Sequence, residues 1–194
     1  MIDPKAETAR YIDGLGADAL AKAADYTAGS HWLLLWGLVV SGVITLLIVR
    51  MGLLDRIACK LAARGWALRT WLVSVAALLA MALIGWPWSI YEEYWREKSY
   101  GRTSQPFGDF LGQEAIGITL STLLGGLFFL GVYALIRRTG RRWWLWSGGF
   151  TALVTAIMLL LSPVLIEPIF NEYKPVPAGP VRDALVKMAD EAQI

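Results

Sequence analysis

Residues 161–180 read LSPVLIEPIFNEYKPVPAGP, and this stretch separates an apolar chain from a polar ending. Long apolar runs precede it, whereas residues 181–194 mix apolar and charged side chains at helical spacing. Pro163 and Pro168 favour an interruption or end of the last apolar helix, because proline lacks an amide donor and clashes with the preceding turn. The stretch therefore predicts the point at which a membrane bundle passes into a water-facing segment.

Upstream of this stretch, four uncharged runs are long enough to cross a bilayer. They cover residues 32–49, 70–91, 115–136 and 143–166. A helix needs about 20 apolar residues to span a hydrocarbon layer, and in lipid only helices or closed barrels satisfy every backbone polar group. Tryptophans lie near the ends of these runs, as interfacial anchors do: Trp32, Trp66, Trp71, Trp86, Trp88, Trp143, Trp144 and Trp146. The predicted fold class is an all-α integral membrane protein with four transmembrane helices.

Small residues also recur at four-residue spacing on three of these runs. On residues 115–136 they are Gly117, Ser121 and Gly125. Such stripes let helix backbones approach closely, which is a main source of helix association in lipid. They predict that the spans pack against one another.

Polar segments flank the predicted transmembrane region, which covers residues 31–167. Residues 1–30 are predicted to be a polar amphipathic lead-in, because a few apolar side chains recur there at near-helical spacing: Tyr11, Ile12, Leu15 and Leu20. Residues 168–194 are predicted to be an exit connector followed by a helix from Pro180. The apolar stripe of that helix indicates the start of a larger soluble domain.

The connections between the predicted spans alternate in charge. Residues 50–69 hold five basic side chains against Asp55 alone, and residues 137–142 hold four arginines and no acid. Since basic loops stay in the cytoplasm, this pattern places both termini and residues 92–114 on the other side. Two interpretations of the mixed charges in residues 92–114 stay open: a polar docking surface, or a solvated loop whose ion pairs contribute ~0–1 kcal/mol each.

Composition excludes several kinds of function. The net charge of +2 and the lack of a basic tract argue against a nucleic-acid partner. A catalytic zinc usually takes three protein ligands, and one histidine, His31, with one cysteine, Cys59, cannot readily supply them. No charged residue lies inside the four runs to mark an ion path. We therefore assign no catalytic, cofactor-binding or metal-binding residue to this chain.

Residues 168–175, PIFNEYKP, resemble the P-x-F-N-x-[FY]-x-P segment of the type 1 CAAX prenyl proteases. A second, weaker likeness lies at residues 100–105, YGRTSQ, where that family carries H-G-F-N-x-Q. The order of spans and motifs agrees over residues 31–194. The positions that match the family motifs are Gly101, Gln105, Pro168, Phe170, Asn171, Tyr173 and Pro175.

The resemblance implies that this chain is the N-terminal transmembrane portion of a membrane zinc metalloendopeptidase, forming its membrane chamber and substrate access. In that family an H-E-x-x-H helix binds zinc through its two histidines, and its glutamate activates the zinc-bound water. The motif does not occur in these 194 residues. Zinc is thus implied for a full-length protein and not for this chain, which is expected to be a truncated form.

The resemblance also implies partners and an orientation. The implied partners are the lipid bilayer, a C-terminal protease domain that this chain is expected to lack, and a peptide or prenylated-protein substrate. The family orientation puts the C-terminal side in the cytosol, opposite to the side that the charge pattern gives. Whether the chain acts in an enzyme stays open, since the alternative is a non-catalytic scaffold or substrate-binding paralogue.

Overall fold

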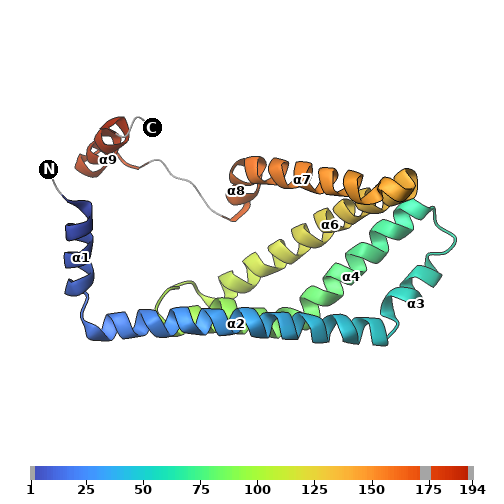
Figure 1. Cartoon of the computed structure of the whole chain (residues 1–194), viewed down its shortest axis with the longest axis horizontal. Coiled ribbons are helices and arrows are strands. Elements are labelled where there is room, and N and C mark those ends of the chain that lie inside the picture. Colours follow the sequence, from blue (N-terminus) through green and yellow to red (C-terminus); the bar gives the residue numbers. More distant parts are fainter. Residues whose placement is uncertain (1–2, 171–175, 192–194) are drawn as a thin grey trace. The chain divides into compact units, whose positions relative to one another are not determined.

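The computed structural model covers the whole chain and describes residues 3–170 and 176–191. All regular elements in these residues are helical, which confirms the all-α fold class for them (Figure 1). The chain divides into two compact units, Met1–Trp143 and Trp144–Ile194.

The first unit holds three long helices and several short elements. The long helices are α2 (Ala17–Arg50), α4 (Trp66–Ser89) and α6 (Phe107–Thr139). The shorter elements are α1 (Pro4–Gly14), α3 (Leu53–Lys60), the π-helical turn η1 (Ile90–Trp95), α5 (Arg96–Ser99) and the 3₁₀ turn η2 (Gly140–Arg142). Figure 1 shows α4 and α6 side by side within this unit.

The packing of α4 against α6 depends on two glycines. A Cβ atom added to Gly126 would lie 2.5 Å from Val75 Cγ2 and 3.0 Å from Trp71 Nε1. One added to Gly125 would lie 2.7 Å from Leu78 Cδ1. The absence of a side chain is what lets the two helices meet. Gly125 belongs to the predicted stripe, whereas Gly117 of the same stripe has no such neighbour within 4 Å, and Gly126 lies outside it.

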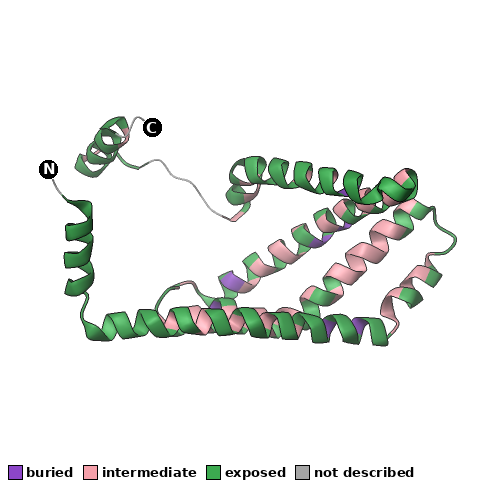
Figure 2. Ribbon diagram, viewed as in Figure 1, coloured by how far each residue is buried: buried purple, intermediate pink, exposed green. Residues whose placement is uncertain are grey.

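Few side chains of the first unit are buried. Two buried side chains are Ile44 and Ile48 of α2. Ile44 packs against α4, since its Cδ1 atom lies 3.4 Å from an ideal Cβ at Gly85. Large apolar side chains are instead exposed, such as Leu38 at 66% and Leu127 at 53%. Most of the ribbon of this unit has the colours of exposed or intermediate residues (Figure 2). Soluble proteins rarely expose so much contiguous apolar surface. The pattern fits helices whose solvent is lipid.

Three helical segments are long and apolar enough to cross a membrane: Ala17–Arg50, Trp66–Ser99 and Phe107–Phe170. The third contains two of the predicted spans and has 64 residues. A straight helix of that length would reach about 96 Å, some three times the thickness of a hydrocarbon layer. Gly140, with φ +52° and ψ −121°, interrupts it at η2. The count of four spans stays a prediction.

Helices continue past the uncharged runs at several ends. The expected boundary at residue 30 lies inside α2, so part of the lead-in is continuous with the first span. Residues 92–114 are also mostly helical, because η1 and α5 extend α4 and α6 begins at Phe107. Residues 100–106 remain as the connection. The expectation of a loop between residues 92 and 114 was therefore wrong for most of this segment.

The second unit contains α7 (Trp143–Leu161) from its second residue on, the π-helical turn η3 (Ser162–Ile166), α8 (Glu167–Phe170) and α9 (Pro180–Glu191). Pro163 lies in η3, where the wider turn accommodates the missing donor, and the helix continues to Phe170. The helix predicted from Pro180 is present as α9. Its apolar side chains are exposed, with Val181 at 68% and Met188 at 57%.

Candidate functional site

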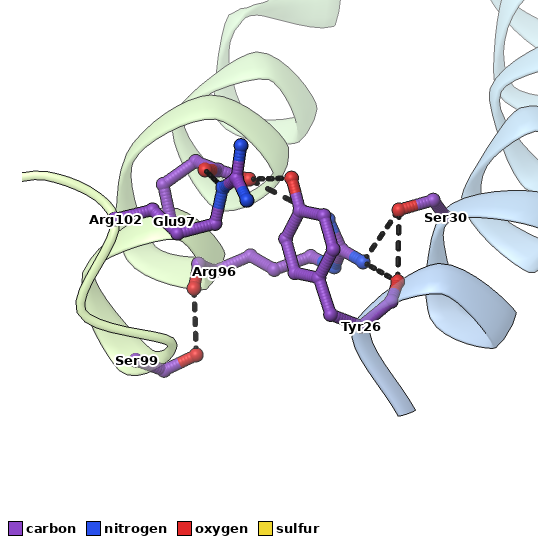
Figure 3. A network of polar contacts seen from close by, with 6 residues as sticks. All are labelled: Tyr26, Ser30, Arg96, Glu97, Ser99 and Arg102. Atoms are coloured by element: carbon purple, nitrogen blue, oxygen red, sulfur yellow. Dashed lines mark hydrogen bonds and ion pairs between the residues drawn. The ribbon is translucent and has the colours of Figure 1, made fainter. Parts of the chain in front are cut away.

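A polar cluster joins the N-terminal half of α2 to the segment that follows α4 in the sequence (Figure 3). We call it the Arg96 cluster. Tyr26 and Ser30 lie one helical turn apart on α2, and Arg96 and Glu97 begin α5. The cluster consists of Tyr26, Ser30, Arg96, Glu97, Tyr100 and Arg102.

Arg96 makes the most contacts in this cluster. Its Nη2 atom donates to the Tyr26 carbonyl oxygen at 2.6 Å and to Ser30 Oγ at 2.9 Å. Its guanidinium carbon lies 4.2 Å from the Tyr26 ring centroid and 5.5 Å from that of Tyr100. The side chain is only 10% exposed. A guanidinium that is hydrogen-bonded and stacked on aromatic faces is held in one orientation.

Glu97 balances part of this positive charge. Its Oε1 atom accepts from the Tyr26 hydroxyl at 2.6 Å, and its Oε2 atom accepts from Arg102 Nε at 3.0 Å. Arg96 Nη1 lies 3.6 Å from Glu97 Oε1. Two arginines and one carboxylate leave the cluster with one net positive charge. Some charges of residues 92–114 therefore contact α2, and others form local ion pairs, so both interpretations of this segment stay predictions.

An aromatic group next to this cluster fixes residues 100–106. The Tyr94 side chain is 1% exposed, and its ring centroid lies 4.9 Å from that of Phe107 and 5.1 Å from that of Phe110. Its hydroxyl donates to the Gln105 carbonyl oxygen at 3.3 Å and accepts from Lys98 Nζ at 3.2 Å. The buried Tyr94 side chain of η1 thus holds the connection into α6 in place.

A groove lies beside the Arg96 cluster, with a volume of about 760 Å³. Its walls come from α2 on one side and from α4, η1 and the segment after them on the other. Arg96 is its cationic group. We call it the aromatic groove because most of its large side chains are aromatic: Trp32, Trp36, Trp88, Tyr91, Trp95 and Tyr100. Such a surface suits an extended apolar chain that ends in a negative charge.

The two motif positions of the first unit lie next to these features. Gly101 has φ +73°, a left-handed conformation that favours glycine, and it ends the helical turn of α5. Gln105 Nε2 donates to Gln113 Oε1 at 2.9 Å, which links the connection to α6. Both positions shape the connection after α5. They do not belong to the hydrogen bonds of the Arg96 cluster.

The other motif positions belong to the second unit or lie outside the described residues. Pro168 is exposed and Phe170 is half-buried, and both are in α8. Asn171, Tyr173 and Pro175 lie outside the described residues. The predicted motif is therefore described only in part.

Within residues 3–170 and 176–191, no group of three or more histidine, cysteine, aspartate or glutamate side chains could hold a metal ion. His31 lies on α2 and Cys59 on α3. The donor set of this part of the chain does not fit a catalytic zinc, which needs about three protein ligands.

The fold defines a class: a multi-pass helical integral membrane protein with an aromatic groove at one end of α4. Residues 7–172 match a family model described as CAAX prenyl protease N-terminal, five membrane helices. That match covers most of the chain, and the chain belongs to this family. The family description gives five helices, whereas the described residues have three candidate spanning segments.

Curated relatives agree with the family. The chain is 28% identical over 103 residues to a CAAX prenyl protease 1 homolog of Oryza sativa subsp. japonica, over 53% of this chain and 24% of the relative. The CAAX prenyl protease 1 homolog of Homo sapiens is 28% identical over 115 residues, which are 58% of this chain and 24% of the relative. The uncharacterized metalloprotease YhfN of Bacillus subtilis is 26% identical over 95 residues, which are 49% of this chain and 22% of the relative. The chain thus spans about a quarter of the length of the curated relatives it matches.

Proposed function

We propose that this chain forms the membrane chamber and substrate access of a zinc metalloendopeptidase whose zinc ligands are supplied by polypeptide outside these 194 residues. Membership in the family and similarity to a metalloprotease support this function. The single histidine supports an external source of zinc ligands. The observation that carries the proposal is the aromatic groove beside Arg96.

The groove walls suit a prenylated peptide. Trp36 on α2 and Trp88 on α4 present aromatic surface, against which an isoprenoid chain loses contact with water. Arg96 is the cationic group in the groove lining and is the candidate partner of a peptide carboxylate, although Glu92 and Glu93 line a neighbouring pocket with it. The hydrogen bonds of Arg96 to Tyr26 and Ser30 hold the two walls together, so that the groove exists before the substrate arrives.

The second candidate is a scaffold or substrate-binding paralogue that engages the same peptides without cutting them. The lack of a metal-binding group in residues 3–170 and 176–191 is compatible with this candidate and with the first one alike. Both functions require the aromatic groove to bind peptide, and they differ in whether the bound peptide is then cleaved. Supplying the zinc-bearing region of a family member should produce chelator-sensitive cleavage under the first function and none under the second.

Binding can be tested with a farnesylated peptide that carries a photoreactive group. We expect it to crosslink to the purified chain in neutral detergent, and Trp36→Ala to lower its affinity about tenfold, as large aromatic contacts commonly do. Leu38→Ala is the control, since Leu38 is 66% exposed on the same helix and does not line the groove. Equal affinity for the unprenylated peptide, or equal loss in both variants, would contradict the proposal.

For orientation, we propose that residues 92–114 face away from the cytoplasm, as the basic loops indicate. A Cys59→Ser background with Ser104→Cys tests this, because Ser104 is exposed in the connection after α5. Arg64→Cys, in the basic loop before α4, is the matched position for the other side. We expect an impermeant thiol reagent added outside the cell to label Ser104→Cys and not Arg64→Cys. Labelling of Arg64→Cys alone would contradict the proposed orientation.

A further inference from the structure

A second groove lies at the opposite end of α4 from the Arg96 cluster. Its volume is about 390 Å³, and it is bounded by α3, α4 and α6, which all belong to the first unit. We call it the α3–α4–α6 groove. It is independent of the aromatic groove and shares no lining residue with it.

The lining of this groove changes along α4 from polar to apolar. Arg69 and Thr70 lie in the first two turns of the helix, and Ser74 follows one turn later. Beyond them the lining is apolar, with Ala77 and Met81 on successive turns. The groove therefore has one charged end and a long hydrocarbon part, the two parts of a phospholipid.

The short helix α3 places the charged end at the membrane surface. Leu54 and Ala58 line the groove, and both are half-buried. Arg56 and Lys60 are exposed on the same helix. A helix with one apolar and one basic face lies in the interface, where lipid headgroups are. Gly52, with φ +60°, makes the turn that leads from α2 into α3.

The charges at this end determine which headgroup fits. No carboxylate of the described ranges 3–170 and 176–191 forms a salt bridge with Arg69. Arg137 of α6 lies at the same end of α4, with its guanidinium 4.8 Å from the ring centroid of Trp66. Residues 50–69 and 137–142 are both strongly basic. Basic side chains at a membrane surface attract anionic lipids, and arginine binds phosphate through paired N–H donors.

From these observations we infer that the α3–α4–α6 groove binds one anionic phospholipid, with its phosphate at Arg69 and an acyl chain along Ala77 and Met81. The tail replaces solvent lipid along an apolar wall, and the headgroup neutralises an arginine that has no carboxylate partner among the described residues. Binding there ties α3 to α4 and α6. The inference does not depend on the proposed function.

Native mass spectrometry of the full chain in neutral detergent tests this binding. Dioleoylphosphatidylglycerol, dioleoylphosphatidylcholine and inorganic phosphate are titrated separately. We expect one phosphatidylglycerol to be retained about tenfold more tightly than phosphatidylcholine, and Arg69→Gln to remove the difference. Arg64→Gln is the control for diffuse surface charge, and it should weaken binding less than about threefold.

Ala77→Leu keeps every charge and fills the apolar part of the groove. We expect it to weaken phosphatidylglycerol binding about as much as Arg69→Gln does, and it keeps the test valid if Arg69→Gln fails to fold. Equal retention of both lipids would overturn the inference. So would equal losses in Arg64→Gln and Arg69→Gln, unchanged binding in Ala77→Leu, or competition by inorganic phosphate at the lipid's own concentration.

Discussion

Replacing Arg96 by glutamine should release the N-terminal half of α2 from the segment after α4. The Arg96 guanidinium donates to the Tyr26 carbonyl and to Ser30 Oγ, and it stacks on the Tyr26 ring. Hydrogen bonds that involve a charged group contribute ~1.5–3 kcal/mol each, and a partly desolvated cation–π contact contributes ~1–2 kcal/mol. Glutamine keeps one amide donor on a shorter, neutral side chain.

We therefore expect Arg96→Gln to lower the free energy of local opening by about 3 kcal/mol, which corresponds to roughly a hundredfold in an equilibrium constant. Hydrogen–deuterium exchange of the amides in residues 22–32 measures this opening. The exchange should accelerate about a hundredfold there and stay unchanged near Gly126, at the contact of α4 and α6.

The matched control is Arg10→Gln on α1. Arg10 is 78% exposed, and its one ion pair among the described residues is with Glu7, one turn away, so its loss should change the exchange of residues 22–32 little. Protection of residues 22–32 that is equal in Arg96→Gln and in the wild type would refute the reasoning. It would mean that contacts other than the Arg96 cluster hold α2 in place.

Substitutions at Gly126, Gly101 and Tyr94, with comparison variants, test further contacts of the first unit. Gly126→Ala should destabilise the helix pair by ~1–3 kcal/mol in a thermal unfolding assay, because its Cβ would lie 2.5 Å from Val75 Cγ2; Gly117→Ala, with open space around it, should be neutral or stabilising. Gly101→Ala should cost ~1–2 kcal/mol because of its φ of +73°, and Gly101→Asn less, measured by proteolysis of the connection. Tyr94→Phe should cost ~0.5–1.5 kcal/mol by thermal unfolding, through loss of the hydrogen bond to Gln105. Each contact would be contradicted by one result. These results are wild-type thermal stability of Gly126→Ala, equal protease resistance of Gly101→Ala and Gly101→Asn, and wild-type thermal stability of Tyr94→Phe.

The helical membrane fold could be predicted from the sequence because it depends on long uncharged runs. Residues 32–49 lie inside α2, residues 70–91 lie in α4 and the start of η1, and the helix predicted from Pro180 is α9. Helix ends were predicted less well. Charged residues need not end a helix at the membrane surface, so α2 starts at Ala17 and helix continues after α4 to Ser99.

The Arg96 cluster could not be predicted from the sequence in the same way. Arg96 and Tyr26 are 70 residues apart, and local charge patterns do not show which partner a side chain finds across that distance. One weak signal was present. Tyr26 and Ser30 lie four residues apart on the lead-in, so they share a helix face, and Gly29 beside them leaves room for the guanidinium, whose Nη2 lies 3.3 Å from an ideal Cβ.

Alkaline carbonate extraction of membranes from cells that express the 194-residue chain tests most directly whether its exposed apolar helices lie in lipid. Leu38 and Leu127 are among the many large side chains that would otherwise face water. We predict that the chain stays in the membrane pellet and enters solution only with detergent. Recovery of a monodisperse chain in the detergent-free supernatant would contradict the membrane-embedded fold and both functions built on it.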